Sequence, residues 1–292
     1  MATTQNTRLG IILMILTTMI FATQDALSRH LGQTYNVYMV VMLRYWFFAA
    51  FAITMAARAP GGLRAAVRTR HPWLQTLRGV LLILEIVVVI LSFVKLGLVE
   101  THAVFTMAPL MVAALSGPIL GEHVGWRRWT AIGIGCVGVL IALNPGAGVF
   151  SPWSLVPLLA ALMFALYGLL TRYVGRNDSA AVSFFWTGIV GAIFATVIGL
   201  PYLQQMSGPD WAIMLLLCCC GCLSHWMLIK VYEIAEASAV QPFAYLQLVW
   251  ISAIGVTIFH ETLRTNVVIG AVVVVCAGLF TLWRQHVRAQ NG

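Results

Sequence analysis

The side chains that could do chemistry in this sequence lie inside long apolar segments. Gln24, Glu85 and His102 are each flanked by mainly apolar residues, and Gln241 and Tyr245 share a later apolar run. A charged group at the centre of a membrane costs at least about 2.5 kcal/mol, so such groups usually face a partner or a cavity. These residues therefore predict a polar binding site within a bundle of helices.

Aromatic residues at helical spacing accompany the polar ones. Phe164 and Tyr167 share one face of an apolar run, since their spacing is close to one helical turn. Pro109 and Pro242 remove backbone hydrogen bonds, which is tolerated where helices line a cavity, although a purely structural kink explains them equally well. For the aromatic residues, contact with lipid or with the core is the simpler alternative. We expect the site to be formed by Gln24, Glu85, His102, Phe105, Phe164, Tyr167, Trp226, Gln241, Tyr245 and Trp250.

The sequence lacks the motifs of common enzyme classes. His260 and Glu261 begin like a zinc-protease motif, but Arg264 stands where the second histidine ligand is required. There is no G-x-S-x-G elbow and no glycine-rich phosphate loop. All six cysteines lie in apolar runs, and the Cys219 and Cys222 pair has no second pair of ligands. We therefore expect no catalytic residue, no metal and no cofactor.

The composition places these candidate residues in a membrane. Of the 292 residues, 61% are hydrophobic and only 9% are charged, and the mean hydropathy is +0.91. A soluble domain carries about 25% charged residues, so we predict an all-α polytopic membrane protein with ten transmembrane helices. The predicted spans are Leu9–Leu27, Val37–Ala57, Trp73–Val94, Thr101–Leu120, Thr130–Leu143, Ser154–Leu170, Ala180–Leu200, Trp211–Val231, Ala237–Phe259 and Asn266–Trp283.

The basic residues predict the orientation of these spans. With both termini in the cytoplasm, most of the 17 lysines and arginines fall on or near the inner side, as the positive-inside rule requires. The net charge of +8 is then explained by topology and the anionic inner leaflet, so nucleic acid is not an expected partner.

Two stretches of the chain, 98–143 and 234–283, repeat each other. Glu122 precedes Gly138 in the first stretch, and Glu261 precedes Gly278 in the second, by almost the same number of residues. The predicted topology puts Glu122 on the inner side and Glu261 on the outer side, so the two copies are inverted. Inverted repeats suit a carrier with alternating access. We predict a first repeat over 1–148, a second over 149–292, and structural roles at helix ends for both glutamates.

These residues resemble the EamA-type branch of the drug/metabolite transporter superfamily over 9–143 and 154–283. The resemblance rests on Arg44 before Tyr45, on the Ala-Val pair that leads to Pro109, and on Gly121-Glu122. The chain looks most similar to the YddG-type amino-acid exporters. It departs from the family pattern at Lys95, at His260 in place of a glycine, and at Tyr245 in place of the repeated proline.

The resemblance and the repeats together imply a carrier in the bacterial inner membrane. We expect it to export small amino acids and related metabolites, with aromatic and other neutral amino acids favoured. A multidrug or S-adenosylmethionine permease of the same fold is the alternative. Its partners would be the small-molecule substrate and the lipid bilayer, and Glu85 is the candidate proton carrier if transport is coupled to protons. Whether Glu85 pairs with Arg44 is left open.

Overall fold

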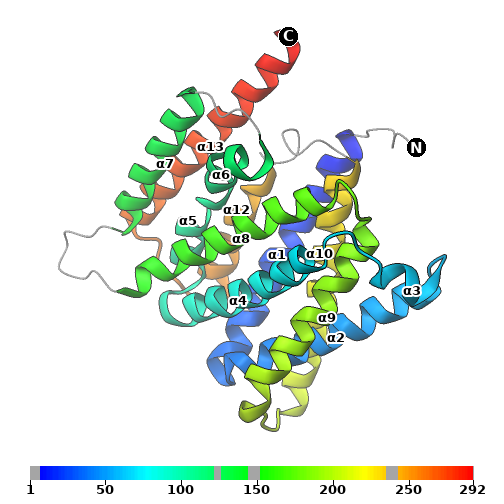
Figure 1. The fold of residues 1–292 in the computed structure, drawn as a ribbon. Helices are drawn as coiled ribbons and strands as arrows, with labels where there is room; N and C mark the ends of the chain where they lie inside the picture. Colours follow the sequence, from blue (N-terminus) through cyan, green and yellow to red (C-terminus); the bar gives the residue numbers. More distant parts are fainter. Residues whose placement is uncertain (1–6, 122–125, 144–151, 235–242, 292) are drawn as a thin grey trace.

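The computed structural model describes residues 7–121, 126–143, 152–234 and 243–291, and all regular structure in these ranges is helical (Figure 1). The helices are α1 (Thr7–Thr34), α2 (Val37–Arg58), α3 (Gly62–Val67), α4 (Pro72–Leu96), α5 (Leu98–Phe105), α6 (Ala108–Leu120), α7 (Trp126–Leu143), α8 (Val156–Val174), α9 (Ala180–Gly199), α10 (Gly208–Ile234), α12 (Leu246–Thr257) and α13 (Thr265–Asn291), with two short 3₁₀ turns, η1 (Pro152–Leu155) and η2 (Leu200–Tyr202).

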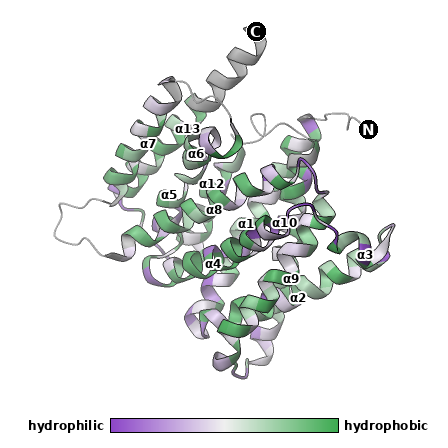
Figure 2. Cartoon of the chain, in the orientation of Figure 1, coloured by the Kyte–Doolittle hydropathy of each residue, from purple (hydrophilic) through white to green (hydrophobic). Residues whose placement is uncertain are grey.

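Most of these helices are built to lie in a membrane. In the described residues, six are long and apolar enough to span a bilayer, and a bent pair over Leu98–Leu120 makes a seventh candidate. Three shorter apolar helices lie at Trp129–Ala142, Leu246–Thr257 and Thr265–Phe280. The apolar character is shown in Figure 2, with polar residues gathered mainly in the turns at helix ends. The described part of the chain is therefore an all-helical membrane protein, and the count of ten spans stays a prediction.

The two halves pack in a reciprocal pattern. Helix α1 of the first half packs against α10 of the second half, and α8 of the second half packs against α4 of the first. The remaining close pairs, α2 with α9 and α7 with α13, also join one helix from each half. The local signals repeat as well, because Asn36 caps α2 and Ser179, at the matching place in the second half, caps α9. This exchange of partners is what two-fold pseudo-symmetry between the halves produces.

One predicted span is broken. The sequence predicts a continuous helix over Thr101–Leu120, but α5 ends at Phe105 and α6 begins at Ala108. Pro109 has no N–H to donate to the Phe105 carbonyl, so the helical hydrogen bonding is interrupted just before it. A bend of 41° separates Leu98–Val112 from Ala114–Leu120, shortly before Pro118.

Helices α7 and α13 approach each other at two glycines. A Cβ placed on Gly270 would lie 2.5 Å from the Gly138 carbonyl oxygen and 2.6 Å from the Ala142 backbone nitrogen. Neither backbone atom can rotate away, so only glycine allows this separation. Small residues therefore hold α7 and α13 together at short range.

We expect Gly270→Ala to lower the free energy of unfolding by about 1–3 kcal/mol, the usual cost of overpacking. Thermal unfolding in detergent measures the change. Gly133→Ala in α7 is the matched control, since a Cβ there meets nothing within 4 Å and alanine favours a helix by about 0.8–1.0 kcal/mol over glycine. Equal melting temperatures for the two variants would contradict the close-packing argument.

Candidate functional site

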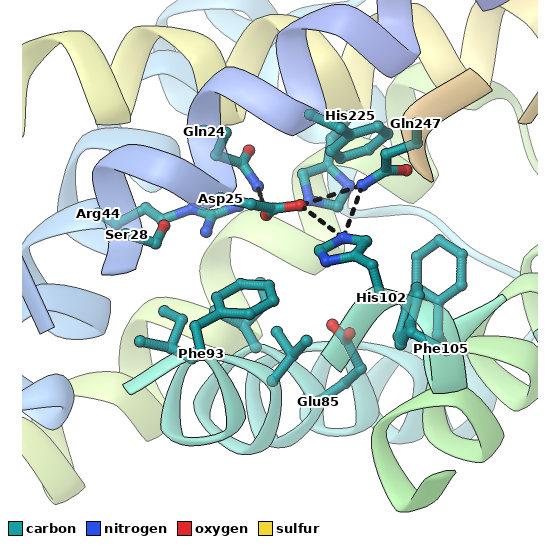
Figure 3. A pocket seen from close by; sticks show the side chains of 15 residues that line it. Gln24, Asp25, Ser28, Arg44, Glu85, Phe93, His102, Phe105, His225 and Gln247 are labelled. Carbon is teal, nitrogen blue, oxygen red and sulfur yellow. Dashed lines mark hydrogen bonds and ion pairs between the residues drawn. The ribbon is translucent and has the colours of Figure 1, made fainter. Parts of the chain in front are cut away.

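A cavity lies at the centre of the bundle, between α1, α2, α4, α5, α8, α10 and α12 (Figure 3). Polar and aromatic side chains alternate around it, and aliphatic residues of α4 close one wall. The lining residues are Phe21, Gln24, Asp25, Ser28, Arg44, Glu85, Ile86, Val89, Ile90, Phe93, His102, Phe105, Phe164, His225 and Gln247.

Asp25 is the centre of the polar network in this cavity. Its Oδ2 atom accepts a hydrogen bond from Gln247 Nε2 at 3.0 Å and lies 3.2 Å from His102 Nε2. Gln24 Nε2 reaches Asp25 Oδ1 at 3.5 Å, and Ser224 Oγ donates to Gln24 Oε1 at 3.1 Å. Figure 3 shows Gln24, Asp25, His102 and Gln247 converging from α1, α5 and α12. Hydrogen bonds and close polar contacts thus connect this buried carboxylate on α1 with α5, α10 and α12.

The position of His102 constrains where protons sit. Its Nδ1 lies 3.1 Å from the carbonyl oxygen of Leu98, so this nitrogen is the donor. The other ring nitrogen then faces the carboxyl oxygen of Asp25. Gln247 Nε2 lies 3.4 Å from the same ring nitrogen, so its amide can donate one N–H to His102 and the other to Asp25 Oδ2. Asp25, His102 and Gln247 therefore form one hydrogen-bonded group at the centre of the cavity.

Aromatic rings continue from His102 toward α8. The Phe93 ring stacks on His102 with centroids 5.2 Å apart, and Phe105 lies 5.9 Å from the same ring. Phe105 and Phe164 are 5.5 Å apart. On the other side, Phe21 contacts His225 edge-on at 5.4 Å. These rings offer flat apolar surfaces on which a planar group could stack.

An arginine and a glutamate line the cavity without contacting each other. Arg44 and Glu85 are each 4% exposed, and no ion pair joins them, nor does either form a hydrogen bond with any described residue. The buried Ser28 hydroxyl likewise has no partner in the described part of the chain. The question left open by the sequence is thus answered for the described side chains: Arg44 and Glu85 share the cavity and do not pair directly.

The structure brings half of the expected site residues together. Gln24, Glu85, His102, Phe105 and Phe164 line the cavity. Gln241 lies outside the described residues.

Four expected site residues point elsewhere. Tyr167 lies beside the buried Arg78, whose Nη1 donates to the Tyr167 hydroxyl at 3.5 Å. Tyr245 packs against Gly278 of α13, and Trp226 contacts Phe184 edge-on at 5.4 Å. Trp250 packs against the main hydrophobic core. Helical spacing identifies a face, but the neighbouring helix decides whether that face meets the cavity.

Sequence reasoning left Asp25, Ser28, Arg44, His225 and Gln247 out of the expected site. Asp25 and Arg44 did carry a signal, because each is a charge within an apolar segment. His225 also lines the cavity, where its ring packs against those of Phe21 and Phe48.

The glutamate of the second repeat connects three elements on the face expected to be outer. Glu261 forms an ion pair with Arg29 of α1 and accepts hydrogen bonds from the backbone N–H groups of Leu98 and Val99 at 2.8 and 2.9 Å. It therefore caps α5, as an acidic group at a helix N-terminus should. The preceding His260 has φ of 54°, a left-handed conformation that glycine adopts more readily than other residues. The structural role expected for Glu261 is consistent with these contacts.

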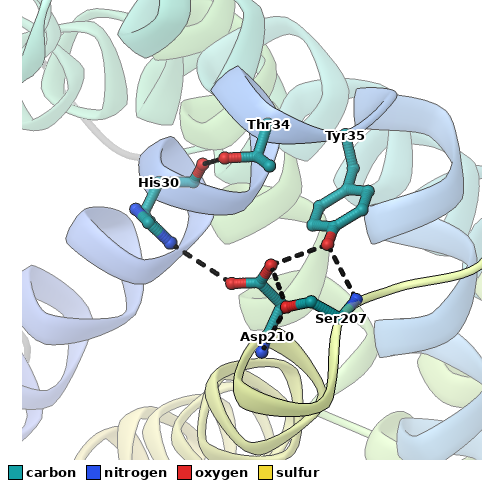
Figure 4. A network of polar contacts seen from close by, with 5 residues as sticks. All are labelled: His30, Thr34, Tyr35, Ser207 and Asp210. Atoms are coloured by element: carbon teal, nitrogen blue, oxygen red, sulfur yellow. Dashed lines mark hydrogen bonds and ion pairs between the residues drawn. The ribbon is translucent and has the colours of Figure 1, made fainter.

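A second polar cluster joins α1 to α10 on the same face (Figure 4). The Tyr35 hydroxyl donates to Asp210 Oδ2 at 2.6 Å and accepts from the Ser207 N–H at 3.0 Å. His30 Nε2 lies 3.5 Å from Asp210 Oδ1. Because the Ser207 hydroxyl and Asp210 also bond each other at the start of α10, the cluster fixes the α1–α2 turn to a capped helix end.

A related cluster on the opposite face joins α4 to the α8–α9 turn. Asp178 accepts hydrogen bonds from the Thr69 hydroxyl, from Gln75 Nε2 at 2.9 Å and from the Arg70 N–H at 3.2 Å. Gln75 in turn accepts from Arg78, which is fully buried. Burial alone would raise the pKa of Asp178, but these three hydrogen bonds outweigh it and hold the pKa below its usual value.

This lowered pKa gives stability that depends on pH. The ionised Asp178 contributes above the unfolded-state pKa of about 4, and the contribution is lost as pH falls through the lower folded value. We expect Asp178→Asn to melt at a lower temperature than the wild type at pH 7, with the difference shrinking below about pH 4. Melting curves in detergent at neutral and acidic pH test this; a difference independent of pH would contradict it.

Comparison with known proteins identifies the family. A model described as the EamA-like transporter family matches residues 8–144 and again residues 151–283. The chain belongs to the EamA-like transporter family. Because the family and the relatives of this EamA-like protein are transporters, the chain is a transporter and not an enzyme.

Curated relatives align along nearly the whole EamA-like chain. An S-adenosylmethionine uptake transporter of Rickettsia prowazekii is 26% identical over 276 residues, covering 94% of this chain and 93% of the relative. A riboflavin transporter of Vibrio cholerae is 24% identical over 277 residues, with the same coverage. A solved crystal structure aligns with a TM-score of 0.64 over 92% of this chain and 94% of its own, at 16% identity, which shows likeness of fold alone.

Proposed function

We propose that this EamA-like protein takes up S-adenosylmethionine, or a closely similar cationic nucleoside, across the inner membrane by alternating access. One observation carries the proposal: the central cavity combines two buried acids, Asp25 and Glu85, with the aromatic pair Phe105 and Phe164. S-adenosylmethionine has a positively charged sulfonium centre and a planar adenine. The acidic side chains can attract the sulfonium charge, and the aromatic rings can stack on the adenine.

The alternative substrates fit these residues less well. Riboflavin, the substrate named for other relatives, has no cationic group for Asp25 and Glu85 to neutralise. Neutral amino acids, with aromatic ones among them, are the substrates that the sequence led us to expect. Aromatic side chains could stack on Phe105 and Phe164, but a neutral amino acid carries no net positive charge for Asp25 and Glu85 to neutralise. The comparisons support transport and favour the S-adenosylmethionine alternative over amino-acid export.

The cavity also contains a candidate coupling group. Asp25 and His102 lie 3.2 Å apart in the cavity, close enough to share a proton. A cationic substrate next to Asp25 would displace that proton, since two positive charges at one carboxylate repel each other. Transport would then exchange a proton for substrate. This assignment differs from the sequence expectation, which placed the proton on Glu85.

Uptake into proteoliposomes tests the proposed function. Purified protein is reconstituted, and the entry of radiolabelled S-adenosylmethionine is followed with and without excess unlabelled S-adenosylmethionine, riboflavin, phenylalanine or tetraphenylphosphonium. Saturable uptake blocked by unlabelled S-adenosylmethionine alone is the expected result. Uptake blocked most strongly by riboflavin, by phenylalanine or by the lipophilic cation would assign the cavity to that substrate class and overturn the proposal.

A further inference from the structure

Arg44 is a buried cation that lines the cavity, and the proposed function gives it no role. Its side chain is 4% exposed, lines the cavity and has no hydrogen bond or ion pair among the described residues. An unpaired buried charge is unfavourable, so a guanidinium kept at such a place calls for an anion. Glu85 is in the same cavity but lies beyond ion-pair distance.

The surroundings of Arg44 are shaped to hold a guanidinium facing the cavity. A Cβ on Gly221 of α10 would lie 2.9 Å from Arg44 Nε and 3.4 Å from Cζ. The missing side chain at Gly221 therefore leaves the room that the guanidinium occupies. The Ser28 hydroxyl lines the same cavity, also without a partner in the described ranges. The Arg44 guanidinium supplies a fork of N–H donors, and Ser28 supplies an O–H donor. Among the described residues, none accepts a hydrogen bond from either side chain.

We propose that Arg44, assisted by Ser28, binds the α-carboxylate of the substrate's amino-acid end. This inference rests on the proposed function, because S-adenosylmethionine carries such a carboxylate. A planar guanidinium binds a carboxylate with two parallel hydrogen bonds, which a lysine cannot reproduce. The acids Asp25 and Glu85 are then left for the ammonium and sulfonium groups.

The placement also orients the substrate. In Figure 3, Arg44 and Ser28 lie at one end of the cavity, Phe105 lies at the other, and Asp25 lies between them. The amino-acid end therefore binds between α1 and α2, and the adenine stacks near α5 and α8. A substrate without the carboxylate keeps every other contact and loses only the one with Arg44.

Decarboxylated S-adenosylmethionine provides the test, because it differs from the substrate by this carboxylate alone. We expect wild-type proteoliposomes to favour S-adenosylmethionine by about tenfold or more in competition, since the analogue leaves a buried donor unpaired. In Arg44→Gln the preference should fall to near unity, and in Arg44→Lys it should be intermediate. A preference that persists in Arg44→Gln would overturn the inference while leaving the proposed function intact.

A second variant covers the case in which Arg44→Gln does not fold. Gly221→Ala displaces the guanidinium and keeps its charge, so it should also reduce the preference for the carboxylate. Gly168→Ala is the matched control, since a Cβ there meets nothing within 4 Å, and it should keep the wild-type preference. Equal preferences in the two alanine variants would count against Arg44. If wild-type protein transports neither compound, the proposed function fails, and this inference fails with it.

Discussion

Replacement of Asp25 by asparagine is expected to reduce S-adenosylmethionine uptake by at least about tenfold, a loss of about 1.4 kcal/mol or more. Asparagine keeps the size of the side chain and can still accept from Gln247, whose amide is 3.0 Å away. It cannot neutralise a cationic substrate, and it cannot form an ion pair with His102. The loss is thus one of charge and not of shape. Initial rates of uptake at saturating and low substrate measure it.

The matched control for this variant is Asp25→Glu, which restores the charge and should recover part of the rate. The amount of folded protein, followed by fluorescence-detected size exclusion, must be equal in both variants. With equal folded protein, a wild-type rate in Asp25→Asn would remove Asp25 from substrate binding. If uptake is also coupled to protons, the Asn variant should lose its response to an imposed pH gradient, since its side chain binds no proton.

Removal of the Glu261 carboxylate is expected to lower the stability of the protein strongly. Its side chain and that of Arg29 are 13% and 12% exposed, so deleting one partner leaves a largely buried charge, which costs about 3–5 kcal/mol. The two N–H groups at the start of α5 lose their cap in addition. We expect Glu261→Ala to lower the free energy of unfolding by about 3 kcal/mol or more, measured by thermal unfolding in detergent.

Glu100→Ala is the matched control on the same face. Glu100 pairs with Arg264 at 3.8 Å, and these side chains are 24% and 63% exposed. Exposed ion pairs contribute about 0–1 kcal/mol, so this variant should melt close to the wild type. If both glutamate variants lose the same stability, the contacts of Glu261 with α1 and α5 are not what stabilises this face.

Much of the fold followed from composition and periodicity. Segments such as Val37–Ala57 and Ala180–Leu200 agree closely with α2 and α9 at both ends, because capping residues and apolar runs mark the ends locally. The break in the predicted span Thr101–Leu120 was missed. A proline indicates a weakened helix, but whether the helix bends, breaks or continues depends on the helices around it.

The candidate site could be predicted only in part. Gln24 and Tyr167 occupy matching positions in the two halves, because their separation equals that of the caps Asn36 and Ser179. In the structure, Gln24 lines the cavity, whereas Tyr167 contacts Arg78. Phe21 and Phe164 are a second matching pair with the same separation, and both line the cavity. Residues at equivalent positions of the two halves therefore have different contacts wherever the neighbouring side chains differ.

The sequence by itself determined that this chain is a helical membrane protein with two related halves and a few ionisable groups in apolar segments. Those features depend on composition and local spacing, which need no knowledge of neighbours. Only the tertiary structure decided that Asp25 meets His102 and Gln247, and that Arg44 stays clear of Glu85. Such contacts join helices far apart in the chain, and the packing angle and rotation of each helix, which set them, are fixed by all the helices together.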